Sequence, residues 1–296
     1  MGTRAGKDGG QKLNPVKIFL LVGDPVKQSL SPAMFNAAFE SLRLNSVYVA
    51  VEVPTKFLDD TVAGVRAIGI SGLNVTIPHK IRIVDLLDEL DDSANLVGAV
   101  NTVKNQRGKL IGFNTDGDGA IRALEENAGT VKGSKVVLLG AGGAARAIAF
   151  SLVRAGAELT IANRTFPRAK ALVSDIERKL GSSANSVPLR RDRLRKVLKN
   201  ADLLINATSV GMYPNVGQTL VTSDLIHHDM VVYDIVYKPL ETRLLKEAKS
   251  AGAEVVNGLG MLVHQGALSF KVWTGKQAPI KVMESAARRE LGRKDK

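Results

Sequence analysis

Cysteine is absent from this chain of 296 residues, and histidine is scarce. Without cysteine there can be no disulfide, no thiolate nucleophile and no cysteine-ligated zinc. The four histidines are His79, His227, His228 and His264, and they do not form an HExxH-type pair. We therefore expect neither a structural nor a catalytic metal site.

Long apolar runs are missing as well. No uninterrupted stretch approaches the roughly 18 apolar residues that a membrane-spanning helix needs. The polar N-terminus also lacks the apolar segment that secretory signals contain. The sequence therefore predicts a cytoplasmic protein without a membrane partner. We interpret residues 1–13 and 288–296 as flexible tails.

Aromatic residues make up only 4% of the chain, although its net charge is +12. Ten of these positive charges come from three segments, with net charges of +2 in 1–12, +5 in 190–199 and +3 in 288–296. The basic residues thus gather in two tails and one predicted surface helix, without the interleaved aromatics of a nucleic-acid site. No nucleic-acid partner is expected, although a basic surface attracts anionic small molecules.

The apolar pattern alternates between strands and helices along nearly the whole chain. Strands are predicted at 16–22, 47–53, 73–77, 100–103, 110–113, 135–140, 158–163, 202–206, 230–235 and 254–257. Helices are predicted at 33–42, 57–68, 81–90 and 119–127, and between the later strands. This alternation indicates a parallel, doubly wound sheet, and the length favours two domains over one.

The most specific local motif follows the predicted strand at 135–140. It reads Gly140-Ala141-Gly142-Gly143-Ala144-Ala145, a G-x-G-x-x-A pattern that opens directly into a helix. In such units the first glycine permits a tight turn, the second lets the backbone approach a pyrophosphate, and the final small residue allows close packing. The helix N-terminus offers amide donors to the phosphates. We therefore predict a dinucleotide site.

The end of the next strand indicates which dinucleotide binds. NAD-binding units place Asp or Glu about 20 residues after the first glycine, where it bonds the ribose 2′-hydroxyl. This chain has Asn163 there, followed by Arg164 and Thr165, with Arg168 one turn later. An amide, a hydroxyl and two guanidinium groups suit a 2′-phosphate, which arginine holds with paired hydrogen bonds. The predicted cofactor is NADP.

A second group of polar side chains lies outside this dinucleotide unit. Several neutral hydrogen-bonding groups, one lysine and one aspartate cluster near the predicted domain junction, as expected of a site for a polyhydroxylated acid. The residues concerned are Ser29, Ser31, Asn74, Thr76, Lys80, Asn101 and Asp116. Asn74 and Thr76 share one face of their predicted strand. A lysine can donate a proton to a developing alkoxide and stabilise its charge.

With these stretches in view, the chain resembles the shikimate dehydrogenases of the shorter, monofunctional bacterial or archaeal kind. The matching segments are SLSPAMFNAAF, GLNVTIPHK, GAVNTV, GFNTDGDG, GAGGAARAI, ANRT, NATSVGM, DIVYKPLETRLL and GLGMLVHQGALSFKVWTG. They occur in the family's order from about residue 14 to residue 287. The resemblance implies the reversible, NADPH-dependent reduction of 3-dehydroshikimate to shikimate in chorismate and aromatic amino-acid biosynthesis.

The resemblance also assigns residues to roles. Lys80 and Asp116 match the family's catalytic pair. The implied substrate contacts are Ser29, Ser31, Asn74, Thr76, Lys80, Asn101, Asp116, Tyr237 and Gln265. The implied cofactor contacts are Gly140 to Ala145, Asn163, Arg164, Thr165, Arg168, Thr208, Met212, Ile235, Gly258 and Met261, with Asp92 as a weaker match. No metal is implied.

The implied fold class is α/β with two domains. An N-terminal substrate domain would comprise residues 14–116 and 259–287, and a Rossmann-type, doubly wound NADP-binding domain would comprise 117–258. The C-terminal helices would return to the first domain. The partner would be a small-molecule substrate, and a monomer and a homodimer both remain open.

Three alternatives remain beside this interpretation. A dual quinate/shikimate dehydrogenase differs mainly in pocket residues and cofactor preference, and Ser29-x-Ser31 with Asn163-Arg164-Thr165 favours shikimate and NADP. A methylenetetrahydrofolate dehydrogenase/cyclohydrolase also pairs a lysine-bearing domain with a dinucleotide domain, but the order of motifs fits it poorly. A non-catalytic NADP-binding sensor is disfavoured by the presence of both Lys80 and Asp116.

Overall fold

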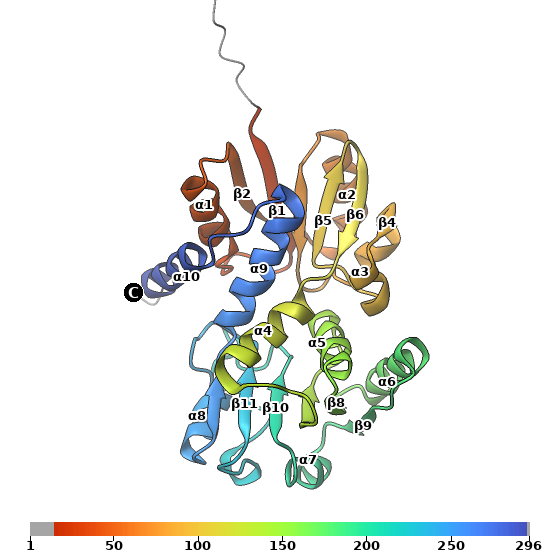
Figure 1. Ribbon diagram of the computed structural model, residues 1–296, viewed down its shortest axis with the longest axis vertical. Coiled ribbons are helices and arrows are strands. Elements are labelled where there is room, and N and C mark those ends of the chain that lie inside the picture. Colours follow the sequence, from red (N-terminus) through yellow and green to blue (C-terminus); the bar gives the residue numbers. More distant parts are fainter. Residues whose placement is uncertain (1–14, 295–296) are drawn as a thin grey trace, which may run out of the picture.

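The computed structural model describes residues 15–294. Two α/β units lie one above the other along the long axis, each built on a six-stranded sheet, and the helices α4 and α9 cross between them (Figure 1). Within the described residues no helix is long and apolar enough to cross a membrane. The same residues contain no group of three or more side chains that could hold a metal ion. The expected tail at 1–13 lies outside them.

The first sheet is mixed and has the order β2-β1-β3-β5-β6-β4. β1, β2 and β3 are parallel, β5 runs antiparallel to both β3 and β6, and β4 is parallel to β6. The strands are β1 Lys17–Gly23, β2 Ser46–Glu52, β3 Gly72–Val75, β4 Glu89–Leu90, β5 Thr102–Gln106 and β6 Lys109–Phe113. The end of β6 lies close to the second unit, because the chain passes from Phe113 to the first helix of that unit at Asp116.

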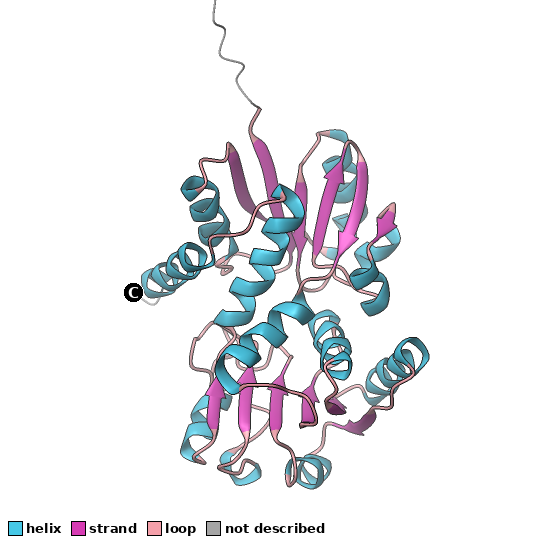
Figure 2. Ribbon diagram, viewed as in Figure 1, coloured by secondary structure: helices cyan, strands magenta, loops and turns pink. Residues whose placement is uncertain are grey.

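Helices cover both faces of the first sheet. The aromatic residues Phe19 and Tyr48 face α1 together with the two C-terminal helices, whereas Leu73 and Val103 face the opposite core. The helices are α1 Ser31–Ser41, α2 Leu58–Ala67 and α3 Asp92–Val97, with short 3₁₀ turns at Thr55–Phe57 and Arg82–Leu86. Figure 2 shows these helices around the upper sheet.

The second sheet is entirely parallel and has the order β12-β11-β10-β7-β8-β9. Its strands are β7 Lys135–Leu139, β8 Glu158–Asn163, β9 Asn185–Pro188, β10 Leu203–Asn206, β11 Val231–Asp234 and β12 Glu254–Val256. The order reverses between β7 and β10, which is the switch point where doubly wound sheets bind their ligands. This is the predicted Rossmann-type arrangement.

Two layers of helices enclose the second sheet. α4 Asp116–Ala128, α5 Gly143–Arg154 and α6 Phe166–Leu180 share one core with it, and α7 Arg191–Leu198 and α8 Arg243–Ser250 share the other. A 3₁₀ turn at Ser223–Leu225 precedes β11. Both faces of the sheet are covered, so β7 has the nearly continuous apolar sequence that is typical of buried parallel strands.

Two C-terminal helices return to the first unit, as expected. These are α9 Leu259–Thr274 and α10 Ile280–Lys294. The prediction of a flexible tail from residue 288 was wrong, since α10 continues to Lys294. Ala287 and Leu291, one helical turn apart, pack into the core that also contains α1. The basic residues between these positions had obscured the spacing.

The predicted helix at 81–90 was also wrong. Only a 3₁₀ turn forms there, and Glu89–Leu90 pairs with β6 as an edge strand. Asp88 binds this segment to its neighbours, because its carboxylate accepts hydrogen bonds from Leu110 N and from Arg66. Pairing with β6 thus outweighs a helical apolar pattern.

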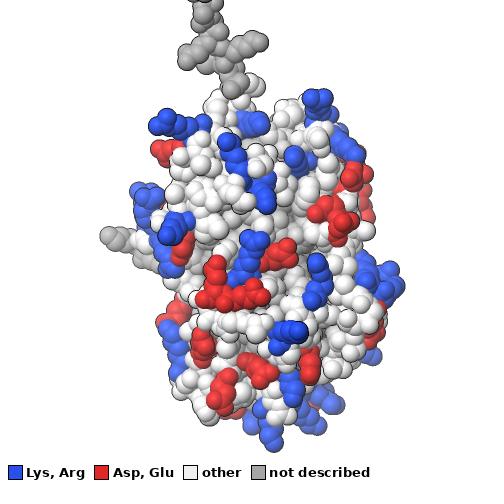
Figure 3. All heavy atoms as spheres, viewed as in Figure 1, with Lys and Arg blue, Asp and Glu red and all other residues white. Residues whose placement is uncertain are grey.

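The basic segment 190–199 forms an exposed helix, as expected. Its charged side chains lie on the surface of α7, and Arg191 and Arg195 pair with Asp224. Lys and Arg gather at the lower end of the face in Figure 3, where α7 lies in Figure 1. Elsewhere on that face positive and negative side chains are mixed.

The two units are held together by more than the chain crossings. α3 points its C-terminus at the second unit, where Lys179 Nζ donates to Asn95 O at 2.6 Å and to Leu96 O at 2.8 Å. Arg146 Nε donates to Val97 O at 2.9 Å. These cations bind carbonyls that a helix end leaves without partners.

Candidate active site

Lys80 and Asp116 form an ion pair between the two units. Lys80 follows the end of β3, and Asp116 is the first residue of α4, 36 positions later. Nζ of Lys80 donates to Oδ2 of Asp116, and the two side chains are 13% and 3% exposed. An ammonium group that is shielded from water but still reachable can act as a proton donor to a bound ligand.

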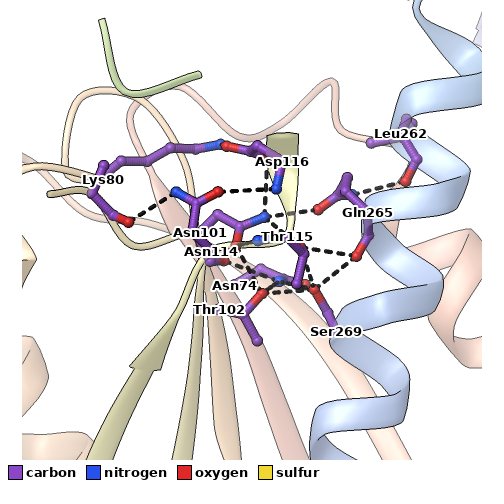
Figure 4. A network of polar contacts seen from close by, with 11 residues as sticks. Asn74, Lys80, Asn101, Thr102, Asn114, Thr115, Asp116, Leu262, Gln265 and Ser269 are labelled. Atoms are coloured by element: carbon purple, nitrogen blue, oxygen red, sulfur yellow. Dashed lines mark hydrogen bonds and ion pairs between the residues drawn. The ribbon is translucent and has the colours of Figure 1, made fainter. Parts of the chain in front are cut away.

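Asn101 orients the aspartate from below. Its Nδ2 donates to Asp116 Oδ1 at 3.0 Å, while Lys80 occupies the other carboxylate oxygen. The same amide contacts Thr115 Oγ1 at 2.8 Å and Gln265 Oε1 at 3.2 Å. Asp116 therefore has both oxygens engaged, which holds its carboxylate in one orientation. Figure 4 shows Asn101 between Lys80, Asp116 and Gln265.

A second set of polar side chains lies beneath this group. Asn74 Nδ2 lies 3.1 Å from each of Asn101 O, Thr102 Oγ1 and Ser269 Oγ. Ser269 Oγ is also bonded to Thr102 Oγ1 at 2.7 Å and donates to Gln265 O. Ser269 is fully buried, so α9 is tied to β3 and β5 through hydroxyl and amide groups. Buried polar groups that are all paired make such a network rigid.

Two serines and two tyrosines continue the polar surface along the first unit. Ser31 opens α1, and its backbone N donates to Ser29 Oγ at 3.2 Å. Burial raises the pKa of the Tyr48 and Tyr237 phenols. Tyr48 Oη donates to Asn74 Oδ1 at 2.8 Å, which joins Tyr48 to the Asn101 network.

The predicted dinucleotide loop lies directly beside the lysine. Gly140 has φ of +115°, a conformation that favours glycine, and α5 begins at Gly143. A Cβ at Gly142 would meet no atom within 4 Å, so the space beside its backbone is open. A Cβ at Gly143 would lie 2.8 Å from the Cβ of Lys80. The loop thus fits a pyrophosphate next to the ion pair.

The corner expected to hold the 2′-phosphate is exposed and basic. Asn163 ends β8, and its Nδ2 donates to Thr165 O at 2.9 Å. Arg164, Thr165 and Arg168 are all exposed there. This donor set fits an anionic phosphate and offers no carboxylate to a ribose hydroxyl pair.

The residues that follow β10 and β11 complete this edge of the second sheet. Asn206 Oδ1 accepts from both Thr208 N and Thr208 Oγ1, and Ile235 N donates to Asn206 O. The backbone of Gly258 lies so close to Ile235 that a Cβ on Gly258 would be 2.1 Å from Ile235 O. Met261 is buried in the adjoining core, and Met212 is half-buried.

Asp234 is fully buried and binds the residues that follow β10 and β11 to one another. Its Oδ1 accepts from Asn206 Nδ2 at 2.9 Å and from Val236 N at 3.0 Å, and its Oδ2 accepts from Thr242 Oγ1 at 2.6 Å. Burial raises the pKa of Asp234 to about 6, and these three donors moderate the rise.

The structure brings many of the expected site residues into contact. Lys80, Asp116, Asn101 and Gln265 form one hydrogen-bonded group. Asn74 is 5% exposed, and its amide is occupied by protein partners. Thr76 is half-buried beyond the end of β3. Asp92 is exposed on α3, and no hydrogen bond within residues 15–294 joins it to the network or to the dinucleotide loop.

Sequence reasoning missed two members of this site. Ser269 lies four residues after Gln265, and that helical spacing could have placed both on one face of α9. Tyr48 sits in a run of valines, where its inward position looks like that of an ordinary core aromatic. Nothing in the sequence marks its hydroxyl as part of the site.

Family models match three segments of the chain. They are the shikimate dehydrogenase substrate binding domain at residues 21–103, the shikimate / quinate 5-dehydrogenase model at 122–236 and the shikimate 5′-dehydrogenase C-terminal domain at 258–288. Together they cover most of the chain in the order that the sequence motifs predict.

Individual proteins show the same similarity over nearly the full length. Shikimate dehydrogenase (NADP⁺) of Methanopyrus kandleri is 54% identical over 274 residues, covering 92% of this chain and 94% of that protein. A crystal structure of shikimate dehydrogenase with NADP⁺ has a TM-score of 0.88 at 48% identity, covering 93% and 96%. The Thermus thermophilus enzyme with NADP(H) and shikimate has a TM-score of 0.83 at 41% identity, covering 93% and 100%.

Proposed function

The chain belongs to the shikimate dehydrogenase family, and on that premise we propose that it reversibly reduces 3-dehydroshikimate to shikimate with NADPH. It is an NADP-dependent oxidoreductase acting on a CH–OH group. The observation that carries the proposal is the position of the Lys80–Asp116 pair, which lies against Gly143 of the dinucleotide loop. Acid–base groups and the reducing cofactor would then meet at one point.

Lys80 is assigned as the proton donor in the reductive direction. NADPH, when bound, supplies the hydride that reduces the carbonyl carbon. The Lys80 ammonium group gives its proton to the carbonyl oxygen as negative charge develops there. Asp116 keeps Nζ in position and accepts a hydrogen bond from a substrate hydroxyl, while Asn101 holds the aspartate. In the oxidative direction the same lysine accepts the proton.

The substrate carboxylate is assigned to the serine–tyrosine end of the network. Ser29, Ser31 and Tyr237 supply neutral hydroxyl donors, and hydroxyl groups of the ring would meet Asn101, Asp116 and Gln265. Thr76 and Asn74 are assigned to the wall below the ring. A site of many donors discriminates strongly against an analogue that lacks the matching polar group.

NADP is assigned to the edge of the second sheet. Gly140 to Ala145 would hold the pyrophosphate, and Asn163, Arg164, Thr165 and Arg168 would hold the 2′-phosphate. Thr208, Met212, Ile235, Gly258 and Met261 would line the nicotinamide end, and Asp92 is the weakest of these assignments. The accompanying domain division is 14–116 with 259–287 for the substrate domain and 117–258 for the NADP-binding domain.

The test is an assay with each substrate and cofactor in parallel. Shikimate and quinate are offered with NADP⁺ and with NAD⁺, and formation of reduced nicotinamide is followed by absorbance. We expect the highest kcat/KM for shikimate with NADP⁺. Comparable efficiency with quinate would favour the dual quinate/shikimate dehydrogenase, and cofactor binding without turnover would favour an NADP-binding sensor. A cytoplasmic location and a homodimer stay predictions, the second to be checked by light scattering.

A further inference from the structure

The side chain of Lys238 contacts the first unit beside the proposed substrate site. Lys238 follows Tyr237 in the segment between β11 and α8, and its Nζ donates to Gln28 Oε1 at 2.6 Å. Gln28 belongs to the first unit, where it directly precedes Ser29. Each end of this contact is thus the sequence neighbour of a residue assigned to the substrate carboxylate. The ammonium group therefore lies near that end of the site.

The position of Lys238 is defined by contacts on both sides. Tyr213 N donates to Lys238 O at 3.2 Å, and Tyr237 and Leu240 pack against the core of the first unit. The lysine is half-buried, and its Nζ lies 5.8 Å from the centroid of the Tyr213 ring. The ammonium group is therefore held at the junction of the two units, unlike a freely solvated surface charge.

The charge of Lys238 has no carboxylate opposite it. Within residues 15–294 its ammonium group is bonded to a neutral amide and forms no ion pair, whereas Lys27, which precedes Gln28, is paired with Glu52. A cation that is partly removed from water is costly unless it is paired. An anionic group of a ligand at this position would supply the missing partner.

The proposed substrate site has a place for such a charge. Ser29, Ser31 and Tyr237 offer only neutral hydroxyl groups to the substrate carboxylate. Lys80, the cation of the catalytic pair, is already bound to Asp116. A hydrogen bond that joins ionised groups is about twice as strong as one between neutral groups. A lysine at the carboxylate end would therefore favour an anionic substrate over a neutral one.

We propose that Lys238 is a further substrate-binding residue, whose ammonium group pairs with the carboxylate that Ser29, Ser31 and Tyr237 hold. Nζ carries three protons, so it can bind the carboxylate while it keeps its bond to Gln28. The inference rests on the proposed function, because it needs the substrate carboxylate at this end. Since this contact is alike in ground state and transition state, its loss should appear in KM and leave kcat nearly unchanged.

Lys238→Met removes the charge and keeps a long, unbranched side chain. We expect the KM for shikimate to rise about 5- to 20-fold, as for one lost charge-assisted hydrogen bond at a partly exposed site. Both kcat and the Kd for NADPH should change less than about 2-fold. Lys238→Arg keeps the charge, so its KM should stay within about 3-fold of the wild-type value. Added salt should raise the KM of the wild-type protein more than that of Lys238→Met, because ions screen the pairing.

Two controls separate the charge from other effects. Gln28→Ala removes the contact between the units but leaves the ammonium group, and Lys246→Met removes an exposed lysine of α8 in the same unit. Both should have a KM for shikimate within about 2-fold of the wild-type value. An unchanged KM in Lys238→Met would overturn the inference. An equal rise in Gln28→Ala would also overturn it, because Lys238 would then act only by tying the units together. Wild-type protein that oxidises no shikimate would instead refute the proposed function, and the inference with it.

Discussion

At the scale of single residues, the chemistry depends on one ammonium group held by one carboxylate. Lys80→Ala removes the proposed proton donor but leaves the loop at Gly140 to Ala145 intact. We expect kcat to fall by roughly 10²- to 10⁴-fold, with the Kd for NADPH changed less than about 3-fold. Steady-state kinetics and a fluorescence titration of NADPH measure the two quantities.

Lys109→Ala is the control for that variant, because Lys109 is an exposed lysine paired with Glu89 on the first sheet. Its kcat should equal that of the wild-type protein. Equal losses of turnover and of NADPH affinity in Lys80→Ala would show that the lysine supports the cofactor rather than the proton transfer.

Asp234 gives a prediction about pH and stability. Its pKa is about 6 in the folded protein and 3.8 in the reference state, so the folded protein binds this proton more tightly than the unfolded chain. Below about pH 4 the carboxyl is protonated in both states and has no effect. From about pH 4 to pH 6 the free energy of unfolding falls, because the carboxyl ionises in the unfolded chain first. Above that range the ionised form of Asp234 lowers the free energy of unfolding by on the order of 3 kcal/mol.

Asp234→Asn should remove that cost while keeping most hydrogen bonds. We expect its Tm at about pH 8 to equal or exceed that of the wild-type protein, and its Tm to vary less between about pH 4 and pH 7. Asp234→Ala should unfold at a lower temperature, since Asn206 and Thr242 lose their acceptor. Parallel pH profiles of Tm for wild type and Asp234→Asn, measured by circular dichroism, would contradict this view.

The residues of the site were predictable where a motif marked them and not elsewhere. Lys80, Asp116 and Gln265 are far apart in the chain but stand in segments whose order resembles that of the family. Tyr48 and Ser269 depend on pairings between β2, β3 and α9, which no local pattern reveals. A lone inward tyrosine and a small helical serine have the same appearance in an ordinary core.

At the scale of elements, the turn between β7 and α5 separates glycines needed for folding from a glycine needed for binding. A Cβ at Gly140 would lie 2.9 Å from Ala207 O, and the residue there has a φ of +115°. Alanine at this position should therefore destabilise the protein. A Cβ at Gly142 would meet nothing within 4 Å.

Gly142→Ala should therefore fold as the wild type does and bind cofactor poorly. We expect a Tm within about 2 °C of the wild-type value and a Kd for NADP⁺ raised at least about 10-fold, because the methyl group occupies space that the pyrophosphate needs. Differential scanning calorimetry and isothermal titration measure the pair. Unchanged affinity would place the phosphates away from this loop.

Buried elements were easier to predict from sequence than edge elements. β7, β10 and β11 are mainly apolar in sequence because helices cover both faces of their sheet. The short edge strands β4 and β9 gave no such signal, and their formation depends on a neighbour already being in place. For the same reason, the sequence predicted a tail from residue 288 onward, because the packing of Leu291 into the core that contains α1 depends on the folded first unit.

At the scale of the whole molecule, the relative position of the two units determines whether Lys80 meets the dinucleotide loop. Lys179 and Arg146 hold the carbonyl end of α3 from the second unit. α9 also bridges them, since Met261 packs in the core around the second sheet and Leu259 and Val263 pack in the core of the first.

Lys179→Ala should loosen this arrangement without unfolding either unit. We expect a larger radius of gyration by small-angle scattering and a KM for shikimate raised about 2- to 5-fold, with the Kd for NADPH unchanged, because a contact at a helix C-terminus is modest in strength. Lys249→Ala, which removes an exposed lysine paired with Glu241, is the control. Identical scattering and KM in both variants would show that α4 and α9 hold the two units in position without Lys179.

The two hydrogen bonds between Asn36 and the backbone of Tyr48 also cover part of the outer edge of the first sheet. β2 is an outer strand of its sheet, and such strands can recruit another chain through free backbone groups. Here the outward N–H and C=O of Tyr48 are both occupied by the Asn36 amide. Asn36→Ala would free these two groups for a strand of another copy, so we expect the Asn36 side chain to reduce association of the protein through this edge.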